Sequence, residues 1–264
     1  MALVTGVPET DSDRLVEAFD RFRREIEAQR GPAVIGEEPE ALHDLRVAVR
    51  RTRSGLKHSR GLLSKKQRRR FQDEFSRLQD VTSSARDYEV WMASLPVDDP
   101  LRLVLAGYHD TARRYASASL AAPHTQKLLA RWHTALASLP RGNTRVSSEE
   151  RIAAQKQRVF QAAETAGVEA DATQLHGLRK RVKELRYLVE LFMDDDRRPL
   201  RKPLKKLQDA LGEVQDVAVQ RAWLLDHAEE VGPVDVRLKE LDEREAVARA
   251  AYGELYAQFL TVAC

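Results

Sequence analysis

Apolar residues recur every three to four positions along nearly all of the 264-residue chain, and no useful stretch alternates strictly between apolar and polar positions. A spacing of three to four places apolar side chains on one face of an α-helix, whereas a half-buried strand would show alternation. Ala, Leu, Arg, Glu and Gln, which favour helices, are abundant. The pattern therefore predicts an all-α fold.

Capping residues and helix breakers divide this pattern into two halves. In the first half the first helix should begin after Asp11 or Ser12 and stop before Gly31-Pro32, and further helices are expected over 39–60, 64–95 (interrupted near 82–87), 100–121 and 125–139. Pro140-Arg141-Gly142-Asn143 marks the boundary. In the second half we expect helices near 149–167, 172–194, 197–230 (broken around Gly212) and 233–261. Four main helices per half predict two antiparallel four-helix bundles over 11–140 and 147–264, and the helix near 125–139 has no obvious counterpart.

Both halves contain one histidine followed by cations. Leu42-His43-Asp44-Leu45-Arg46 precedes Arg50, Arg51 and Arg53, and Leu175-His176-Gly177-Leu178-Arg179 precedes Lys183 and Arg186. A later pair of segments also matches, Leu78-Gln79-Asp80 with Asp87 and Leu207-Gln208-Asp209 with Asp216. The histidines are 133 residues apart and the later segments 129 apart, which predicts an internal duplication with pseudo-twofold symmetry.

Helical geometry turns each motif into a row of cations beside an apolar flank. The first row, a strip about 80° wide and ~21 Å long, consists of His43, Arg46, Arg50, Arg53 and Lys57. The second row consists of His176, Arg179, Lys183 and Arg186. Glu190 stands where the first row has Lys57, so the second row should be shorter, or Glu190 should orient one of its arginines.

Charge is concentrated around these rows. Residues 41–70 carry a net charge of +10 and residues 176–206 carry +6, although the whole chain carries only +3. Like charges in a row repel one another unless an anion lies along them. Arginine donates paired hydrogen bonds to phosphate, lysine adds a point charge, and histidine can donate from its ring. The rows therefore predict capture of a long phosphate polyanion such as inorganic polyphosphate.

Other chemistry has little support in the sequence. The rows lack clustered carboxylates that would hold Mg²⁺, and His109, His124 and His133 show no metal-ligand spacing. We expect no catalytic residues, no metal and no cofactor. The lone cysteine, Cys264, and the lack of a signal peptide or a long apolar run predict a soluble cytoplasmic protein that does not enter a membrane.

The two motifs resemble those of the CHAD family, the conserved histidine α-helical domain. The resemblance rests on the segments 43–53 and 175–187, and on Leu207-Gln208-Asp209-Ala210-Leu211-Gly212 with Asp216. It implies one CHAD domain over 1–264, built as two four-helix bundles with a basic surface that binds inorganic polyphosphate, often at polyphosphate granules. Thr82-Ser83 replaces the Leu-Gly pair in the first half, which weakens the expectation of a tight helix junction there.

The predicted polyphosphate-binding residues are the members of the two rows, their basic neighbours, and three cations that precede the 82–87 and 211–216 segments. They are His43, Arg46, Arg50, Arg51, Arg53, Lys57, His176, Arg179, Lys180, Lys183, Arg186, Arg77, Lys205 and Lys206. Asp87 and Asp216 are interpreted as structural, because a carboxylate beside cations more plausibly caps a helix or holds an arginine.

Two alternative functions remain open at this point. A histidine phosphotransfer module also places an exposed histidine on a helical bundle, although it needs no whole row of cations. RNA or DNA could bind through its phosphates, as could other phosphate polyanions, although recognition of unpaired bases usually adds aromatic stacking platforms. Only Tyr187 lies within either motif, so we consider nucleic acid a less favoured partner than polyphosphate.

Overall fold

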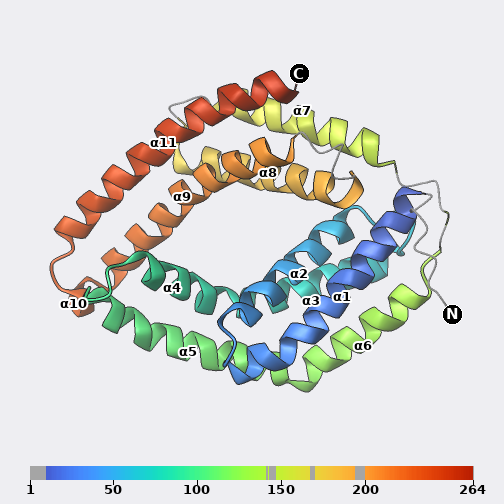
Figure 1. Cartoon of the computed structure of the whole chain (residues 1–264), viewed down its shortest axis with the longest axis horizontal. Coiled ribbons are helices and arrows are strands. Elements are labelled where there is room, and N and C mark those ends of the chain that lie inside the picture. The colour runs from blue at the N-terminus through green and yellow to red at the C-terminus, as the bar shows by residue number, and fades with distance from the viewer. Residues whose placement is uncertain (1–9, 141, 143–146, 167–169, 194–199, 264) are drawn as a thin grey trace. The chain divides into compact units, whose positions relative to one another are not determined.

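The computed structural model describes the chain except for residues 1–9, 141, 143–146, 167–169, 194–199 and 264 (Figure 1). Every secondary-structure element that it assigns to the described residues is a helix, so the all-α prediction is confirmed. The chain divides into two compact units, Met1–Ser147 and Ser148–Cys264, and each is described by itself. The internal duplication stays a prediction. No helix in the described part of the chain has both the length and the apolar character of a membrane span.

The described residues of the first unit form α1 (Asp11–Ile35), α2 (Pro39–Lys57), α3 (Lys65–Val81), α4 (Ser83–Ser94), α5 (Leu101–Ala121) and α6 (Pro123–Ala137). The helix α2 packs against α1 and α3, and α5 packs against α4 and α1. Trp132 of α6 is fully buried and meets Phe19, Phe71 and Phe75 edge-on, with ring centroids 4.8 to 5.6 Å apart. The short helix α6 therefore contributes to the core of the first unit.

The first helix continues past Gly31-Pro32, so its predicted end was wrong. It stops at Gly36, which adopts the left-handed conformation (φ 87°) and donates its backbone N–H to the Pro32 carbonyl at 2.8 Å. Pro32 removes one helical hydrogen bond. The extra turn nevertheless buries Ala33, and the Val34 carbonyl accepts from Ser117 of α5. Packing against the rest of the unit thus outweighs the breaker.

The second unit contains α7 (Ser148–Ala166), α8 (Ala172–Phe192), α9 (Arg201–Asp226), α10 (Ala228–Val231) and α11 (Asp235–Ala263) among its described residues. The helix α8 packs against α7 and α9, and α9 also packs against α11. The predicted break around Gly212 was wrong, because α9 runs through it without interruption. Leu211 and Val214 are buried on either side, and their packing offsets the roughly 1 kcal/mol that a helical glycine costs.

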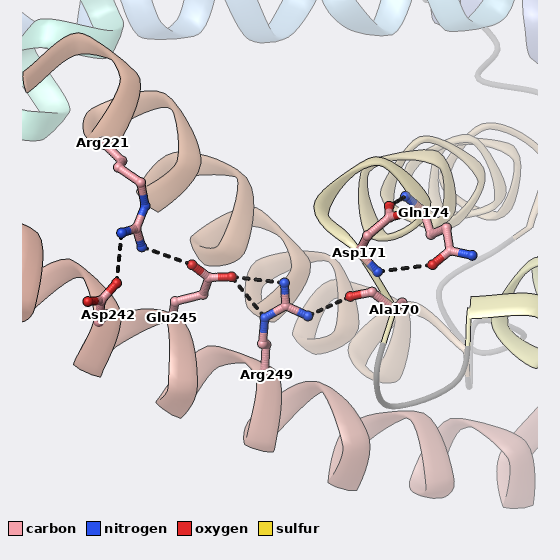
Figure 2. Close-up of polar contacts among 7 residues, drawn as sticks. All are labelled: Ala170, Asp171, Gln174, Arg221, Asp242, Glu245 and Arg249. Carbon is pink, nitrogen blue, oxygen red and sulfur yellow. Dashed lines mark hydrogen bonds and ion pairs between the residues drawn. The ribbon is translucent and has the colours of Figure 1, made fainter. Parts of the chain in front are cut away.

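The start of α8 is held by its own capping box and by a side chain of α11 (Figure 2). Asp171 and Gln174 form a capping box at its first turn. Just before it, the Ala170 carbonyl accepts from Arg249 of α11 at 2.6 Å. Arg249 also pairs with Glu245 at 2.8 Å, and Glu245 pairs with Arg221 of α9 at 3.1 Å. This chain of contacts ties the helix that carries the second row to its two neighbours.

Candidate functional site

The two motif helices each bury an apolar flank beside their row. The leucine and valine residues of these flanks are at most 2% exposed: Leu42, Leu45, Val49, Leu56, Leu175, Leu178, Val182, Leu185 and Val189. In the rows themselves, Lys57 is exposed, Arg46 is buried, and the other members are half-buried. The sequence spacing thus predicted correctly which face of each helix is buried, and most row cations retain contact with solvent.

Arg46 differs from the rest of its row. It is only 8% exposed, and its Nη1 donates to the Gln79 carbonyl at 3.0 Å, to Thr82 Oγ1 at 3.0 Å and to Ser83 Oγ at 3.2 Å. In the orientation of the Gln79 amide that satisfies both of its ends, the amide oxygen accepts from Nη2 at 3.2 Å. Burial lowers the pKa of Arg46, and the Asp87 carboxylate opposes that shift. The Arg46 guanidinium thus links α2 to the Gln79 carbonyl and to the hydroxyls of Thr82 and Ser83.

The groups that Arg46 contacts form the break between α3 and α4. Thr82 Oγ1 donates to the Leu78 and Gln79 carbonyls, and Ser83 Oγ donates to the Gln79 carbonyl, each at 3.0 Å. These hydroxyls satisfy carbonyls in the last turn of α3. The interruption predicted near 82–87 is confirmed, and it lies where Thr82-Ser83 replaces the Leu-Gly pair.

Arg179 occupies the position of Arg46 in the second motif, but its surroundings differ. Its guanidinium lies over Gly212, where a Cβ atom would be 3.7 Å from Nε and 3.8 Å from Nη2. Within the described part of the chain, Arg179 Nε is buried without a hydrogen-bond partner, and so is Gln208 Oε1. Leu211-Gly212 offers no side-chain hydroxyl here. The bonds that hold Arg46 therefore have no equivalent at Arg179.

The two motif histidines also have different partners. His176 Nδ1 lies in hydrogen-bond contact with Gln215 Oε1, which leaves its Nε2 for another partner. At His43 the corresponding neighbour is a cation, Arg86. Burial lowers the pKa of His43, and the charges of Arg86 and Arg50 lower it further, while Glu40 opposes them. Two cationic side chains, Arg86 and Arg50, thus act on the histidine of the first row.

Three further arginines of the motifs have identified contacts. Arg53 donates to Ser76 Oγ of α3 at 3.0 Å, and Arg51 lies over the Phe22 ring of α1. In α8, Arg186 Nε lies 3.5 Å from Glu190 Oε1 and its guanidinium lies over the Tyr187 ring. Glu190 thus contacts an arginine, which is the second of the two roles expected for it.

The remaining predicted cations lie outside the two rows. Arg77 lines a cavity of about 600 Å³ together with residues of α5 and α6. Lys205 pairs with Asp209 at 3.5 Å on the surface of α9, and Lys206 and Lys180 are exposed. Arg77 is therefore a predicted site residue that lies at a cavity of the first unit.

Sequence reasoning missed several residues near the rows. Arg86 and Gln215, which face the two histidines, occupy positions 129 residues apart, so the repeat spacing could have identified them as a pair. At the first turns of α3, Lys65, Lys66 and Arg69 are exposed cations. Cations at a helix N-terminus are disfavoured by the helix dipole. The +10 charge of residues 41–70 was the signal in the sequence for these additional cations.

A family model for the CHAD domain matches residues 17–225. The chain belongs to the CHAD domain family. Two solved structures share the CHAD fold seen here. The crystal structure of the CHAD domain from the plant Ricinus communis has a TM-score of 0.72 at 23% identity, covering 99% of this chain and 90% of that one. PptA from Streptomyces chartreusis has a TM-score of 0.71 at 16% identity, covering 95% and 98%. A search of curated proteins gives no match.

The CHAD match contains both rows but ends before α11, which begins at Asp235. The contact between Arg249 and the Ala170 carbonyl nevertheless reaches from α11 to the start of the second motif helix. Residues outside the matched range thus position a helix that carries a family motif.

Proposed function

We propose that this CHAD protein binds inorganic polyphosphate through the first and second rows, without catalysing a reaction on it. The same attraction would bring it to polyphosphate granules in the cytoplasm. A polyphosphate chain repeats its negative charge along its length, as each row repeats its positive charge. Contacts along one polymer add through effective concentration and release of counterions, although single exposed ion pairs contribute only about 0.2–1 kcal/mol.

The observation that carries the proposal is the set of cations left available on these helices. Arg50, Arg179 and Lys180 make no hydrogen bond or ion pair with any residue that the structure describes. The charges of Arg50 and Arg86 both act on His43, which also belongs to the first row. Repulsion among these cationic groups is relieved when an anion binds. The bound state therefore gains charge-assisted hydrogen bonds that these side chains do not make in the free protein.

One aromatic residue bears on the choice between polyphosphate and nucleic acid. Tyr187, the aromatic side chain within the second motif, is only 4% exposed and is covered by Arg186. Its ring therefore offers no open face for stacking an unpaired base. This favours a ligand that presents phosphates without bases.

A charge-matched pair of variants tests the proposal. Arg50→Ala/Arg179→Ala/Lys180→Ala removes the three available cations, and Arg114→Ala/Lys127→Ala/Lys239→Ala removes three exposed cations of α5, α6 and α11. We expect the first variant to lose on the order of hundredfold in affinity for sodium polyphosphate, and the second to stay within about threefold. Titration calorimetry at fixed salt measures both, with circular dichroism to verify folding.

Equal affinities of the two folded variants would contradict the assignment to the rows. Competition distinguishes the alternatives, because single-stranded RNA that displaces polyphosphate at equal phosphate concentration would favour nucleic-acid binding. Acid-labile phosphate on His43 or His176 after incubation with acetyl phosphate would favour phosphotransfer.

A further inference from the structure

We infer that the first arginines of the two motifs have different roles: Arg179 contacts the phosphate chain, whereas Arg46 is a positioning residue that holds the break between α3 and α4. The inference rests on the proposed polyphosphate binding and adds which arginine serves it. It also identifies the cause of the difference, which is a pair of residue positions, Thr82-Ser83 in the first unit and Leu211-Gly212 in the second.

The first step is the hydrogen-bond capacity of each guanidinium. Arg46 Nη1 already donates to two hydroxyls and a carbonyl, and its side chain is buried. A phosphate could recruit Arg46 only by breaking those bonds and leaving the Gln79 carbonyl and the hydroxyls with fewer partners. Arg179 makes no such bonds to the described residues and remains half-buried, so its Nη donors can turn to an anion.

The second step is the groups beneath each arginine. Residues 82 and 83 correspond to 211 and 212 in the repeat, so hydroxyls under Arg46 are replaced by an aliphatic side chain and a glycine under Arg179. Gln208, the counterpart of Gln79, keeps its Oε1 buried and without a partner among the described residues. In the described part of the second unit, therefore, neither the Arg179 Nε nor this amide oxygen forms a hydrogen bond.

The third step is the neighbouring histidine. His176 is oriented through Nδ1 by Gln215, so its Nε2 can face the same ligand as Arg179, one helical turn away. His43 instead lies beside Arg86, whose guanidinium pairs with Glu89 at 2.9 Å. In the first unit, contacts to phosphate then come from Arg50 and its neighbours, with Arg46 beneath them.

The substitution Gly212→Ser tests this cause directly, with Gly212→Ala as the matched control. A Cβ atom at residue 212 meets Arg179 only at ordinary contact distance, so both side chains fit. The serine adds a hydroxyl acceptor for Arg179, as Ser83 provides for Arg46, and the alanine does not. We expect Gly212→Ser to lower the affinity for polyphosphate severalfold, and Gly212→Ala to stay within about twofold of wild type.

Arg179→Ala should lower the affinity by on the order of tenfold, and by much less in the Gly212→Ser background, because that arginine is already engaged. Arginine Nε–H signals in ¹⁵N NMR give a second readout, in which polyphosphate shifts the Arg179 signal and leaves the Arg46 signal in place.

Equal affinities of Gly212→Ser and Gly212→Ala, or a polyphosphate-induced shift of Arg46 as large as that of Arg179, would overturn the division of roles while the proposed function stands. A wild-type protein that does not bind polyphosphate would overturn both.

Discussion

In α2, Arg46 is the buried member of the first row and bonds to the groups that end α3, whereas in α8 the matching Arg179 lies over Gly212 of the continuous helix α9. Both arginines follow a histidine by three residues and both adjoin buried leucines. The difference therefore comes from the neighbouring helix, through two residues at the repeat-equivalent position. It teaches that a repeated motif can retain its pattern while its members divide structural and binding roles.

The largest expected difference between the two arginines is in the stability that is lost when each is removed in turn. Arg46→Ala should lower the free energy of unfolding by about 3 kcal/mol, because it leaves a buried carbonyl and two hydroxyls without their charged donor. Arg179→Ala should change it by less than about 1 kcal/mol. Urea denaturation followed by circular dichroism measures both, and Arg50→Ala provides a control for loss of charge in the same row. Similar losses for Arg46 and Arg179 would show that their structural roles are alike.

The starts of the two motif helices provide a smaller contrast. The helix α2 begins at Pro39 without a side-chain cap, whereas the start of α8 depends on Arg249 of α11. Arg249→Ala should lower the free energy of unfolding by about 1 kcal/mol, because the Ala170 carbonyl and Glu245 both lose a charged donor. Lys239→Ala, in the same helix, should leave it within about 0.5 kcal/mol. If the two variants unfold alike in thermal and urea denaturation, α11 does not hold α8.

The smallest expected effect distinguishes the two histidines by pH. Bound phosphate favours the protonated ring of His43, so affinity for polyphosphate should rise as pH falls through its pKa, by at most tenfold per pH unit. Because burial and Arg86 lower the pKa of His43 in the free protein, this rise should level off only below the ordinary histidine value of about 6.5.

The variant Arg86→Gln makes the surroundings of the two histidines more alike. It places a glutamine near His43 at the position that Gln215 occupies near His176. It removes one of the charges that lower the His43 pKa in the free protein, so the rise in affinity should level off at higher pH than in wild type. Affinities measured from pH 5 to 8 for wild type, Arg86→Gln and His43→Gln test this. A pH profile that Arg86→Gln leaves unchanged would exclude His43 as the titrating group.

Much of the fold could be predicted because amphipathic periodicity and caps act locally. Ser64 begins α3 through a capping box with Gln67, as its place before the helix indicates, and the interruption near Thr82 was expected. Two wrong predictions, the helix end at Gly31-Pro32 and the break at Gly212, both involve residues that weaken an isolated helix, and the cap of the first helix is Thr10 rather than Asp11 or Ser12. In the folded units their helices continue because neighbouring turns bury Ala33 and Leu211. That compensation depends on residues distant in sequence.

The sequence by itself determined the all-α class, the two cationic rows and the apolar flank beside each, because helical spacing places these residues irrespective of their neighbours. The tertiary structure decided which cations remain available. Arg46 and Arg179 have the same place on their helices, but different groups lie next to their guanidinium groups. Arg46 meets the break between α3 and α4, whereas Arg179 meets the continuous helix α9. Whether an arginine bonds to the protein or to a ligand depends on the acceptors within about 3 Å of its guanidinium, and the fold sets the position of those acceptors.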